Sequence, residues 1–587
     1  MHSTSDEYKE SMKRTLRNRS YLSVNIGVIN QQGQQQSYVD NRENALYLAS
    51  INDIFNSKKT ITRYATFEQD FVKADGGMVF PPRVAPYGIQ SGFISNGLLS
   101  QGEQSIMIKF TGVDYVDVKG LTIDFGDTFP TSFYIQTNNE TFTVSSNSNR
   151  LYSTNNVFEG AEYFKIVPTS MKNNNMRFRV AQLVFGVGIL LGNEIIKSST
   201  LKYHVSEVSE TVPQIDFTVT VDNSAKEYNI DNTESTLNFF EIGQNFEVQY
   251  GYELDNGTIE WIKYTTLKLK SWSADNTVAK FSATDPLDLY DNTYYKGKYY
   301  DSGISLYDLA VLIFEDIGLT IDQYVIDSSL SSIIVHNPVP CIKHKEALQL
   351  IANCSLCALL IDNEARIVIG QIPTDENQYD LGTRDMTSTP VGSQLEKIRD
   401  VNVVKLYYYK NPSTAAKQIA KTTYTLKSSN NTVTMQWSNP CYDISVTSDL
   451  YTSTIIESGS YYCVVQVSGL PATDVNVAIT LTGFELDSTK STFQKYINQN
   501  GRSKIYTNPL VDNDTNANNL LEWLSDYYAS DREYEISYRG DPSLQVNDII
   551  NMENDFISNL LCRIYEHTID FNGALKGKIK ARREVDV

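Results

Sequence analysis

The chain has 587 residues and a formal net charge of −20, with 41% hydrophobic and 11% aromatic residues. That length is too great for one compact core and predicts roughly three to five folded units. Tight binding to a phosphate backbone depends on clustered Lys and Arg, so the acidic balance argues against a dedicated nucleic-acid-binding protein. A negatively lined channel that lets nucleic acid slide past stays open as an interpretation. The 38 Tyr, with abundant Thr and Val, predict a mostly β architecture.

Targeting and redox signals are few. The six cysteines are scattered and fit no disulfide framework, so we expect reduced core thiols. The segment 1–19 is polar and of mixed charge, without the apolar centre of a signal peptide. The longest apolar stretch, 183–191, is too short for a bilayer span and is broken by Gly186 and Gly188. We expect a soluble chain that is not exported by a signal peptide.

The first third of the chain alternates strand patterns with polar excursions. A β-rich run at 21–30 leads into a Gln-rich patch at 31–36, and a second run follows at 64–80. The stretch 84–105, rich in Gly and Ser, is typical of a linker. From 106 to 212, short alternating runs with turn residues about every ten positions predict one inserted β-sandwich.

After Pro213 the alternation is nearly ideal and predicts a half-buried antiparallel strand. Its apolar face carries Ile215, Phe217, Val219 and Val221. A second strand surrounds Val248, and the turn signal DNG at 255–257 separates it from a third strand around Trp261. We expect these strands to form a meander that curls into a barrel.

Helix signals appear only in the second half. Ser305 is an N-cap residue, and apolar side chains follow at helical spacing until Gly318 stops the pattern. A second helix is predicted from about His344 and a last one around Leu520. A strand hairpin across 359–369 completes a small α+β domain.

The predicted fold class is therefore mainly β with a small α+β part: two β-barrels, an α+β domain and an inserted β-sandwich. The predicted boundaries, in chain order, are an N-terminal arm at 1–20, the first part of barrel one at 21–105, the inserted sandwich at 106–212, the rest of barrel one at 213–303, the α+β domain at 304–392, and barrel two at 393–587 with a β-rich insertion at about 436–500.

No complete catalytic motif is present in the sequence. The nearest is H-x-E at His344 and Glu346 followed by C-x-x-C at Cys354 and Cys357, which shares parts with the zinc deaminase signature. That signature has a Pro before its first Cys, where this chain has Asn353, and here one short helix would hold every part. We interpret the two cysteines as core residues. Carboxylate pairs for glycoside hydrolysis stay open, because only their spacing in space would make a site.

Other candidate binding residues are better explained by structural roles. Asp285 and Asp541 each precede Pro, where Asp most often caps a turn. A cluster of tyrosines could stack on sugar rings or pack a subunit interface, and we favour the interface. These are Tyr294, Tyr295, Tyr299 and Tyr300. We predict no catalytic, cofactor-binding or metal-binding residue, no cofactor, and a protein that is not an enzyme.

Six short sequence strings, taken in their order along the chain, carry a family resemblance. They are EIGQNFEVQYG at 241–251, FSATD at 281–285, SLYDLA at 305–310, HKEALQLIAN at 344–353, YRGDP at 538–542 and FNGALKG at 571–577. Together they resemble the tail hub family of bacteriophages and related injection machines, which in Gram-positive phages includes the tail-associated, or minor structural, proteins. The resemblance spans 21–90 and 213–587. It implies a homotrimer whose two hub barrels per subunit form a pseudo-sixfold ring that continues the tail tube.

The predicted sandwich has strings of another kind. VKGLTIDF at 118–125, YFKIVP at 163–168 and RFRV at 177–180 resemble a discoidin-like jelly roll. Modules of that kind often bind sugars, but their ligands sit on variable loops, so no binding residue is assigned. The chain ends just after its last predicted strand, and no wall-degrading or fibre domain is expected.

The leading hypothesis is a structural hub of a phage tail tip or baseplate, located in the virion and made in the bacterial cytoplasm. Expected partners are two further copies of the chain, a distal tail protein or tail tube, the tape-measure protein, and spike or fibre proteins, with DNA passing through the lumen. The alternative is a carbohydrate-binding host-attachment protein of the virion. A secreted glycosidase or adhesin is a third interpretation, against which the missing signal peptide counts.

Overall fold

The computed structural model places most of the chain in β-strands, as the sequence predicts. The residues that it describes are 1–40, 45–47, 54–55, 89–91, 95–96, 105–126, 129–174, 177–232, 241–372, 378–427, 431–468, 471, 473–557 and 559–584. Among these, no helix is both long and apolar enough to cross a membrane.

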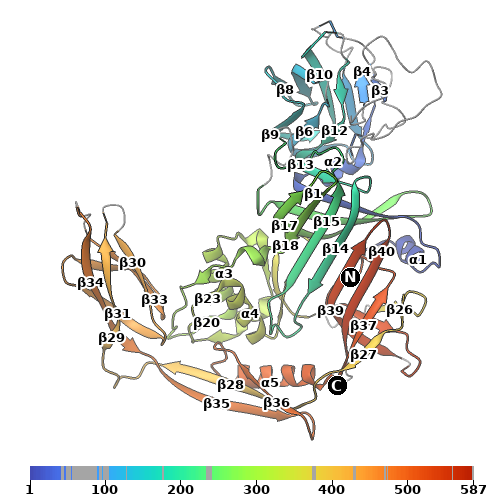
Figure 1. Ribbon diagram of the computed structural model, residues 1–587. Helices are drawn as coiled ribbons and strands as arrows, with labels where there is room; N and C mark the ends of the chain where they lie inside the picture. The colour runs from blue at the N-terminus through green and yellow to red at the C-terminus, as the bar shows by residue number, and fades with distance from the viewer. Residues whose placement is uncertain are drawn as a thin grey trace.

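One large sheet forms the centre of the molecule (Figure 1). The path runs β13-β1-β16-β17-β18-β15-β14-β39-β40-β37-β27, with β38 pairing β39 and β26 pairing β38. The strands are β1 (Ser20–Ile29), β13 (Gly186–Leu191), β14 (Ile196–His204), β15 (Gln214–Asp222), β16 (Asn245–Glu253), β17 (Ile259–Ala274), β18 (Val278–Thr284), β26 (Gln378–Leu381), β27 (Val391–Gln394), β37 (Arg532–Tyr538), β38 (Ile549–Met552), β39 (Leu560–Phe571) and β40 (Leu575–Arg583).

The alternation in β15 explains its place in this sheet. Ile215, Phe217 and Val219 are buried, while the polar residues between them are half-buried or exposed. The consecutive strands β16, β17 and β18 form the predicted meander, and β15 lies beside β18 at its end. The division of this sheet into two barrels stays a prediction.

The inserted sandwich, defined here as residues 31–184, leaves the large sheet after β1 and returns at β13. These two strands pair directly, with Ile29 opposite Gly186, and Asn30 N–H donates to the Phe185 carbonyl at 2.7 Å. The predicted insertion at 106–212 therefore differs from the structure at both ends. Alternation alone does not say which neighbour a strand will choose, so β13 and β14 were grouped with the wrong sheet.

In its described residues, the inserted sandwich has three small sheets and one helix around its own apolar core. The elements are α2 (Gln31–Gln36), β2 (Ser37–Val39), β3 (Ala45–Tyr47), β4 (Ile89–Ser91), β5 (Ile106–Phe110), β6 (Val116–Asp124), β7 (Pro130–Gln136), β8 (Thr141–Val144), β9 (Leu151–Ala161), β10 (Tyr163–Met171), β11 (Arg179–Val180) and β12 (Gln182–Val184). The strand pattern predicted at 64–80 lies outside the described residues. Figure 1 shows the inserted sandwich standing beyond one end of the large sheet.

A small α+β unit packs beside the large sheet and confirms the predicted helices. In α3 (Leu306–Ile317), the Ser305 Oγ accepts a hydrogen bond from Asp308 N–H at 3.0 Å, and Gly318 ends the helix with φ 87°. The other elements are α4 (His344–Cys354), β19 (Thr293–Tyr294), β20 (Ile304–Ser305), β21 (Tyr324–Ile326), β22 (Ile334–Val335), β23 (Ile342–Lys343), β24 (Ala358–Ile361), β25 (Ile367–Gly370) and the 3₁₀ turns Pro286–Leu289, Ile321–Gln323 and Ser328–Ser332. Strands β24 and β25 form the predicted hairpin.

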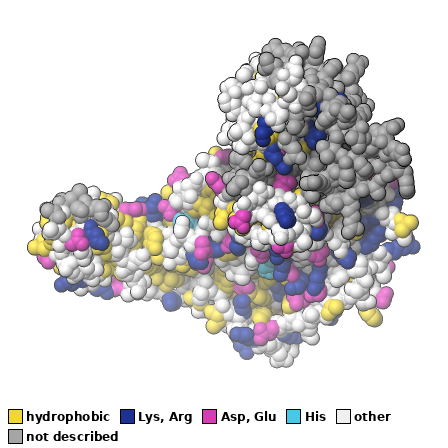
Figure 2. All heavy atoms as spheres, turned by 45° about the horizontal axis from the view of Figure 1, so that its top comes forward, with side chains coloured by type: hydrophobic (Ala, Val, Ile, Leu, Met, Phe, Trp, Pro, Cys, Tyr) yellow, Lys and Arg dark blue, Asp and Glu magenta, His cyan; other side chains and the backbone are white. Residues whose placement is uncertain are grey.

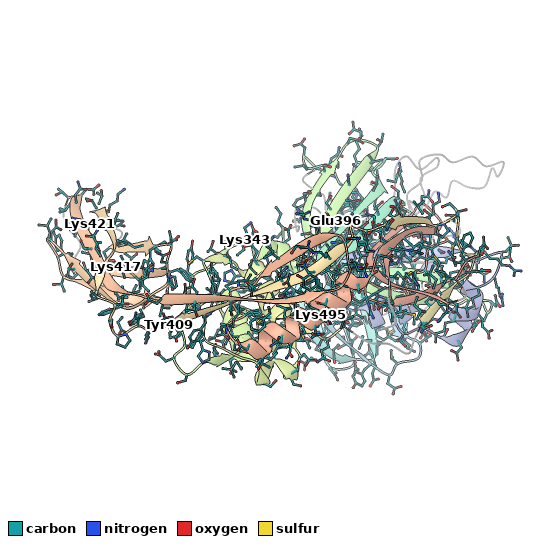
Figure 3. All side chains as sticks on the ribbon, turned by 90° about the horizontal axis from the view of Figure 1, so that it is seen from below. Lys343, Glu396, Tyr409, Lys417, Lys421 and Lys495 are labelled. Atoms are coloured by element: carbon teal, nitrogen blue, oxygen red, sulfur yellow. The ribbon has the colours of Figure 1, made fainter. Side chains whose placement is uncertain are left out.

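A ribbon of three strands extends from the body of the molecule to a second small sandwich (Figures 1 and 3). The ribbon consists of β28 (Ile398–Tyr409), β35 (Asp487–Tyr496) and β36 (Arg502–Thr507), and α5 (Asp514–Ala529) follows it. The tip sandwich consists of β29 (Lys417–Leu426), β30 (Thr432–Gln436), β31 (Cys441–Ser448), β32 (Ser453–Ser458), β33 (Tyr462–Val467) and β34 (Val475–Glu485). In Figure 3, Tyr409 marks the neck and Lys421 the outer end.

The tip sandwich begins earlier and ends earlier than the insertion predicted at about 436–500. Residues 487–496 are not part of it, because β35 pairs with β28 along its whole length, from Asp400 opposite Tyr496 to Tyr409 opposite Asp487. The tip has a separate apolar core, whereas the large sheet, the α+β unit and α5 share a single one. We call the parts that share this core the body.

Candidate functional site

Two distant parts of the chain meet at a seam in the middle of the large sheet. Strand β14 pairs antiparallel with β39 from Ser199 opposite Phe571 to His204 opposite Glu566. Leu201 and Ile569 face each other across the seam, and both are fully buried. The seam therefore joins the strands predicted as two separate barrels into one continuous sheet.

A loop after β14 ties the α+β unit to this seam. The Ser209 hydroxyl donates to the Cys357 carbonyl at 3.0 Å and accepts from Leu359 N–H at 3.0 Å. The Asn353 side-chain amide donates to the Val208 carbonyl at 2.8 Å. Because these contacts are buried and hydrogen-bonded, they fix the position of α4 against the sheet.

A buried histidine lies at the centre of a polar network behind the seam. His567 contacts the hydroxyl of Tyr264 through Nδ1 at 3.0 Å and the hydroxyl of Tyr538 through Nε2 at 2.7 Å. All three side chains are almost completely buried. Burial lowers the pKa of His567 to about 3, so the imidazole is neutral at physiological pH.

Asp541 extends the network to the N-terminal arm. Its carboxylate accepts hydrogen bonds from the hydroxyls of Tyr8 at 2.9 Å and Tyr379 at 3.0 Å, and from Ser543 N–H at 2.9 Å. Tyr8 belongs to the short helix α1 (Asp6–Met12), whose side chains pack on Tyr252. Asp541 was predicted to cap a turn; it does so through Ser543, and it also anchors two distant tyrosines.

Two arginines also hold the arm, because each donates hydrogen bonds to backbone carbonyls in the segment of the other. Arg17 Nη1 donates to the carbonyls of Arg539 at 3.1 Å and Gly540 at 2.6 Å. In the other direction, Arg539 donates to the carbonyls of Arg14 at 2.7 Å and Thr15 at 3.1 Å. The first twenty residues therefore close over the turn at 538–542, more than five hundred positions away in the sequence.

The residues shared with the deaminase signature do not meet. His344 opens α4 and Cys354 closes it, so about 15 Å of helix separates them. The His344 ring contacts the Asn292 carbonyl at 2.7 Å and the Asp316 carboxylate at 2.8 Å, and Glu346 accepts from Lys343 N–H. The described residues contain no group of three His, Cys, Asp or Glu that could hold a metal ion.

Five of the six cysteines are buried and Cys341 is half-buried; none forms a disulfide, in agreement with the predicted core role. Cys354 contacts the Leu510 carbonyl at 3.6 Å, and Cys357 contacts the Ser355 carbonyl at 3.5 Å. Burial raises the pKa of Cys357 to about 11, which keeps the thiol protonated and unreactive.

Asp285 precedes the 3₁₀ turn Pro286–Leu289, as predicted for an Asp before Pro, although its side chain makes no cap hydrogen bond there. Instead its carboxylate accepts from Ile215 N–H at 3.0 Å and so joins the end of β18 to the start of β15. Burial raises the pKa of Asp285 to about 6.

The tyrosine cluster packs an interface, but the part of it seen here lies within the chain. Tyr294 is fully buried against the His344 ring, at 5.7 Å between centroids. Tyr295 packs on Tyr462 of the tip sandwich at 5.4 Å, and the adjacent Gly297 carbonyl accepts from Ser460 N–H at 2.7 Å. The subunit-interface interpretation is therefore corrected for Tyr294, which is buried inside the α+β unit, whereas Tyr295 contacts the tip sandwich of the same chain.

The surface charge is mixed on the face that Figure 2 presents. Lys and Arg side chains lie beside Asp and Glu side chains over the body. Lysines on the surface of the ribbon are paired with acids on α5, such as Lys405 with Asp514 and Lys495 with Glu522. Exposed pairs of this kind contribute little to stability, so they act mainly on solubility and partner choice.

Scanned against models of known protein families and against curated proteins, the sequence gives no match. Solved structures give distant similarities. The 43 kDa tail protein of prophage MuSo2 from Shewanella oneidensis is 10% identical, with a TM-score of 0.38, and the similarity covers 68% of this chain and 95% of that one. A tail protein from Neisseria meningitidis MC58 is 10% identical, with a TM-score of 0.38, over 67% of this chain and 93% of the other.

A third similar structure is the prophage tail protein gp18 from Listeria monocytogenes EGD-e. It is 9% identical, with a TM-score of 0.33, and the similarity covers 67% of this chain and 91% of that protein.

Proposed function

We propose that the chain is a structural hub of a phage tail tip or baseplate. Three copies form a ring that continues the tail tube, joins it to the tip and lets DNA pass. The protein acts through its shape rather than through a catalytic centre, and it belongs to the virion. Its partners are a distal tail or tube protein, the tape-measure protein, and spike or fibre proteins.

The observation that carries this proposal is the seam between β14 and β39. A ring wall has to hold its curvature while other proteins and DNA press on it, so each subunit needs a rigid frame. The seam supplies one, because Leu201 and Ile569 bury apolar surface while the backbone ladder continues across it. The buried contacts of His567 and Asp541 stiffen the frame from behind.

The strings that carry the family resemblance also fall at these junctions. YRGDP at 538–542 contributes Tyr538 and Asp541 to the buried network, and HKEALQLIAN at 344–353 forms most of α4. FSATD at 281–285 ends with the Asp that joins β18 to β15. The residues of these strings therefore hold elements of the fold together, which favours a structural protein.

The test is the mass of the purified chain by light scattering, with electron-microscope class averages of the same peak. A trimer with a central hole is expected. A monomer that stays monomeric at high concentration and shows no hole would contradict the hub.

A second candidate function, attachment to a host carbohydrate, is favoured by the way the inserted sandwich joins the body. The module has its own core and leaves the large sheet through a single hairpin position, between Asn30 and Phe185. An extra domain mounted at one hairpin can serve binding without disturbing the frame.

Because β1 and β13 pair directly, the inserted sandwich can be deleted without changing the pairing of these two strands. Replacing residues 31–184 by Asn-Gly turns β1 and β13 into a two-residue hairpin of the type that this dipeptide favours. The shortened chain should keep the assembly state of the full chain. Binding to host cells should be lost if the sandwich is the attachment module, and unchanged binding would assign attachment elsewhere.

A further inference from the structure

A pocket of about 390 Å³ opens where four parts of the body meet. Its wall combines the loop after β14, Leu356 beyond α4 with the two residues that follow β25, helix α5, and the last residues of β40 with Arg563 of β39. The apolar part of the lining consists of Val208, Leu356, Ile372 and Trp523. The pocket lies outside the network of His567 and Asp541.

The three arginines of the pocket are not equivalent. Arg563 is engaged, because its Nε donates to Glu584 at 2.5 Å and its Nη1 donates to the Asn547 carbonyl at 3.0 Å. Arg582 lies over the Tyr527 ring at 3.9 Å, and its buried Nε has no hydrogen-bond partner among the described residues. Arg583 lines the pocket beside it and forms no ion pair with the described part of the chain.

One acid completes the arrangement. Glu207 is only 8% exposed and lines the pocket, and its Oε1 is buried with no hydrogen-bond partner among the described residues. A buried polar atom without a partner is costly, and a ligand that supplies the missing hydrogen bond recovers that cost. Glu207 Oε1 and Arg582 Nε therefore have unused hydrogen-bonding capacity at the wall of one cavity, and Arg583 adds a second cation to that wall.

The protonation of Glu207 decides which charge the ligand must carry. Burial raises the pKa of Glu207 to about 7; Arg563 and Arg582 oppose this shift, and Glu584 adds to it. Asp526 and Tyr527 face the same cavity from α5. Below neutral pH the Glu207 carboxyl is thus largely neutral and can donate a hydrogen bond, so the arginines are left to attract an anion.

We propose that this pocket binds an organic carboxylate. Arg582 and Arg583 hold the two carboxylate oxygens, Glu207 donates a hydrogen bond to one of them, and the apolar wall beside Trp523 takes the organic part. A singly charged carboxylate suits the pocket better than phosphate, because Glu584 and Asp526 already offset part of the positive charge. The carboxylate belongs either to a free small molecule or to an acidic side chain of a second copy. This inference does not depend on the hub proposal.

The test uses the full chain and titration calorimetry with benzoate, with benzamide as the uncharged control ligand. Benzoate should bind saturably at pH 6, and benzamide should not. The variants Arg582→Gln and Arg583→Gln should each weaken binding by about tenfold or more, since each removes a charge-assisted hydrogen bond. Arg502→Gln on the ribbon, where the arginine pairs with Glu396 away from the pocket, should leave binding unchanged.

Glu207→Gln separates a ligand site from a merely structural cluster. Gln cannot ionise, so this variant should bind benzoate at pH 6 and keep that affinity at pH 8, where the unmodified chain binds about tenfold more weakly. Absent benzoate binding, or binding that the arginine variants do not change, would overturn the proposal. Light scattering then separates the two sources: Arg582→Gln reduces the assembled mass only if the carboxylate comes from a second copy.

Discussion

The body and the tip sandwich differ in how far apart in the sequence their core residues lie. The core of the body joins Leu22 of the first strand to Ala581 of the last, with contributions from the large sheet, the α+β unit and α5. The core of the tip sandwich draws its buried residues only from Leu426 to Leu481. A core assembled from distant segments forms only when all of them are in place, whereas a local core can form and melt on its own. The body therefore behaves as one cooperative unit and the tip as an accessory.

The inserted sandwich also differs from the body in what it buries. The inserted sandwich relies on aromatic packing, with ring centroids 5.1 Å apart for Phe125 and Phe133 and 5.3 Å apart for Phe158 and Phe164. The body has aromatic contacts too, such as Phe217 with Phe246, but it also buries a His that is hydrogen-bonded to two Tyr. Apolar packing tolerates small shifts, but a buried hydrogen bond must be made in the correct register. The body is thus the part whose geometry is most strictly specified.

The largest effect is expected when a buried charge is placed in each kind of core. Leu201→Asp puts an unpaired carboxylate into the seam and should destabilise the whole body by about 4 kcal/mol or more. Val465→Asp does the same to the tip sandwich, whose Val465 is also fully buried. Scanning calorimetry should show the main transition lowered in Leu201→Asp and unchanged in Val465→Asp.

Limited proteolysis with mass spectrometry locates the damage. In Val465→Asp, new cuts should fall between 417 and 485 only, and in Leu201→Asp they should spread over the body. If Val465→Asp lowers the main transition as much as Leu201→Asp does, the tip is not an independent unit and the comparison fails.

A smaller effect should appear as a pH dependence confined to the body. The pKa of His567 is lowered to about 3 in the folded chain, whereas an unfolded chain binds the same proton near pH 6.5. The unfolded state therefore takes up the proton first, and stability falls as the pH drops from about 6.5 toward 3, by about 4 kcal/mol over that range.

His567→Gln removes this titration while keeping a donor and an acceptor for Tyr264 and Tyr538. Its unfolding free energy in urea should be slightly lower at pH 7.5, and should fall less steeply toward pH 4 than that of the unmodified chain. Equal slopes would mean that His567 is not the group that makes the body acid-sensitive.

Local signals predicted the elements well, because each depends on a few neighbouring residues. Ser305 and Gly318 bound α3 as expected, and the alternation after Pro213 gave the buried face of β15 correctly. The interpretation of Cys354 and Cys357 as core thiols rested on the lack of a second ligand pair, and the structure agrees. Caps, turns and periodicity are physical requirements of single elements, so one sequence suffices to read them.

The pairing of strands that are distant in the sequence could not be predicted from such local signals. Nothing in the alternation of β14 says that its partner is β39, nor that β1 and β13 form one hairpin around the inserted sandwich. His567 was not singled out, although a lone His within an alternating strand is the signal that could have marked it. The pairing of Asp541 with Tyr8 joins residues 533 positions apart, and no local pattern encodes it.

The smallest expected effect concerns this hydrogen bond between Tyr8 and Asp541, which holds the N-terminal arm on the body. Tyr8→Phe removes one hydroxyl from Asp541, while Tyr379 and Ser543 still donate to the carboxylate. The expected loss is about 1 kcal/mol, which corresponds to roughly fivefold more frequent opening of the arm. Proteolysis within the first twenty residues should accelerate by that factor without any change in the main transition, and Tyr38→Phe on the inserted sandwich should not accelerate it. A lowered main transition in Tyr8→Phe would instead make the arm part of the cooperative body, since only a shared core transmits a local loss to every strand.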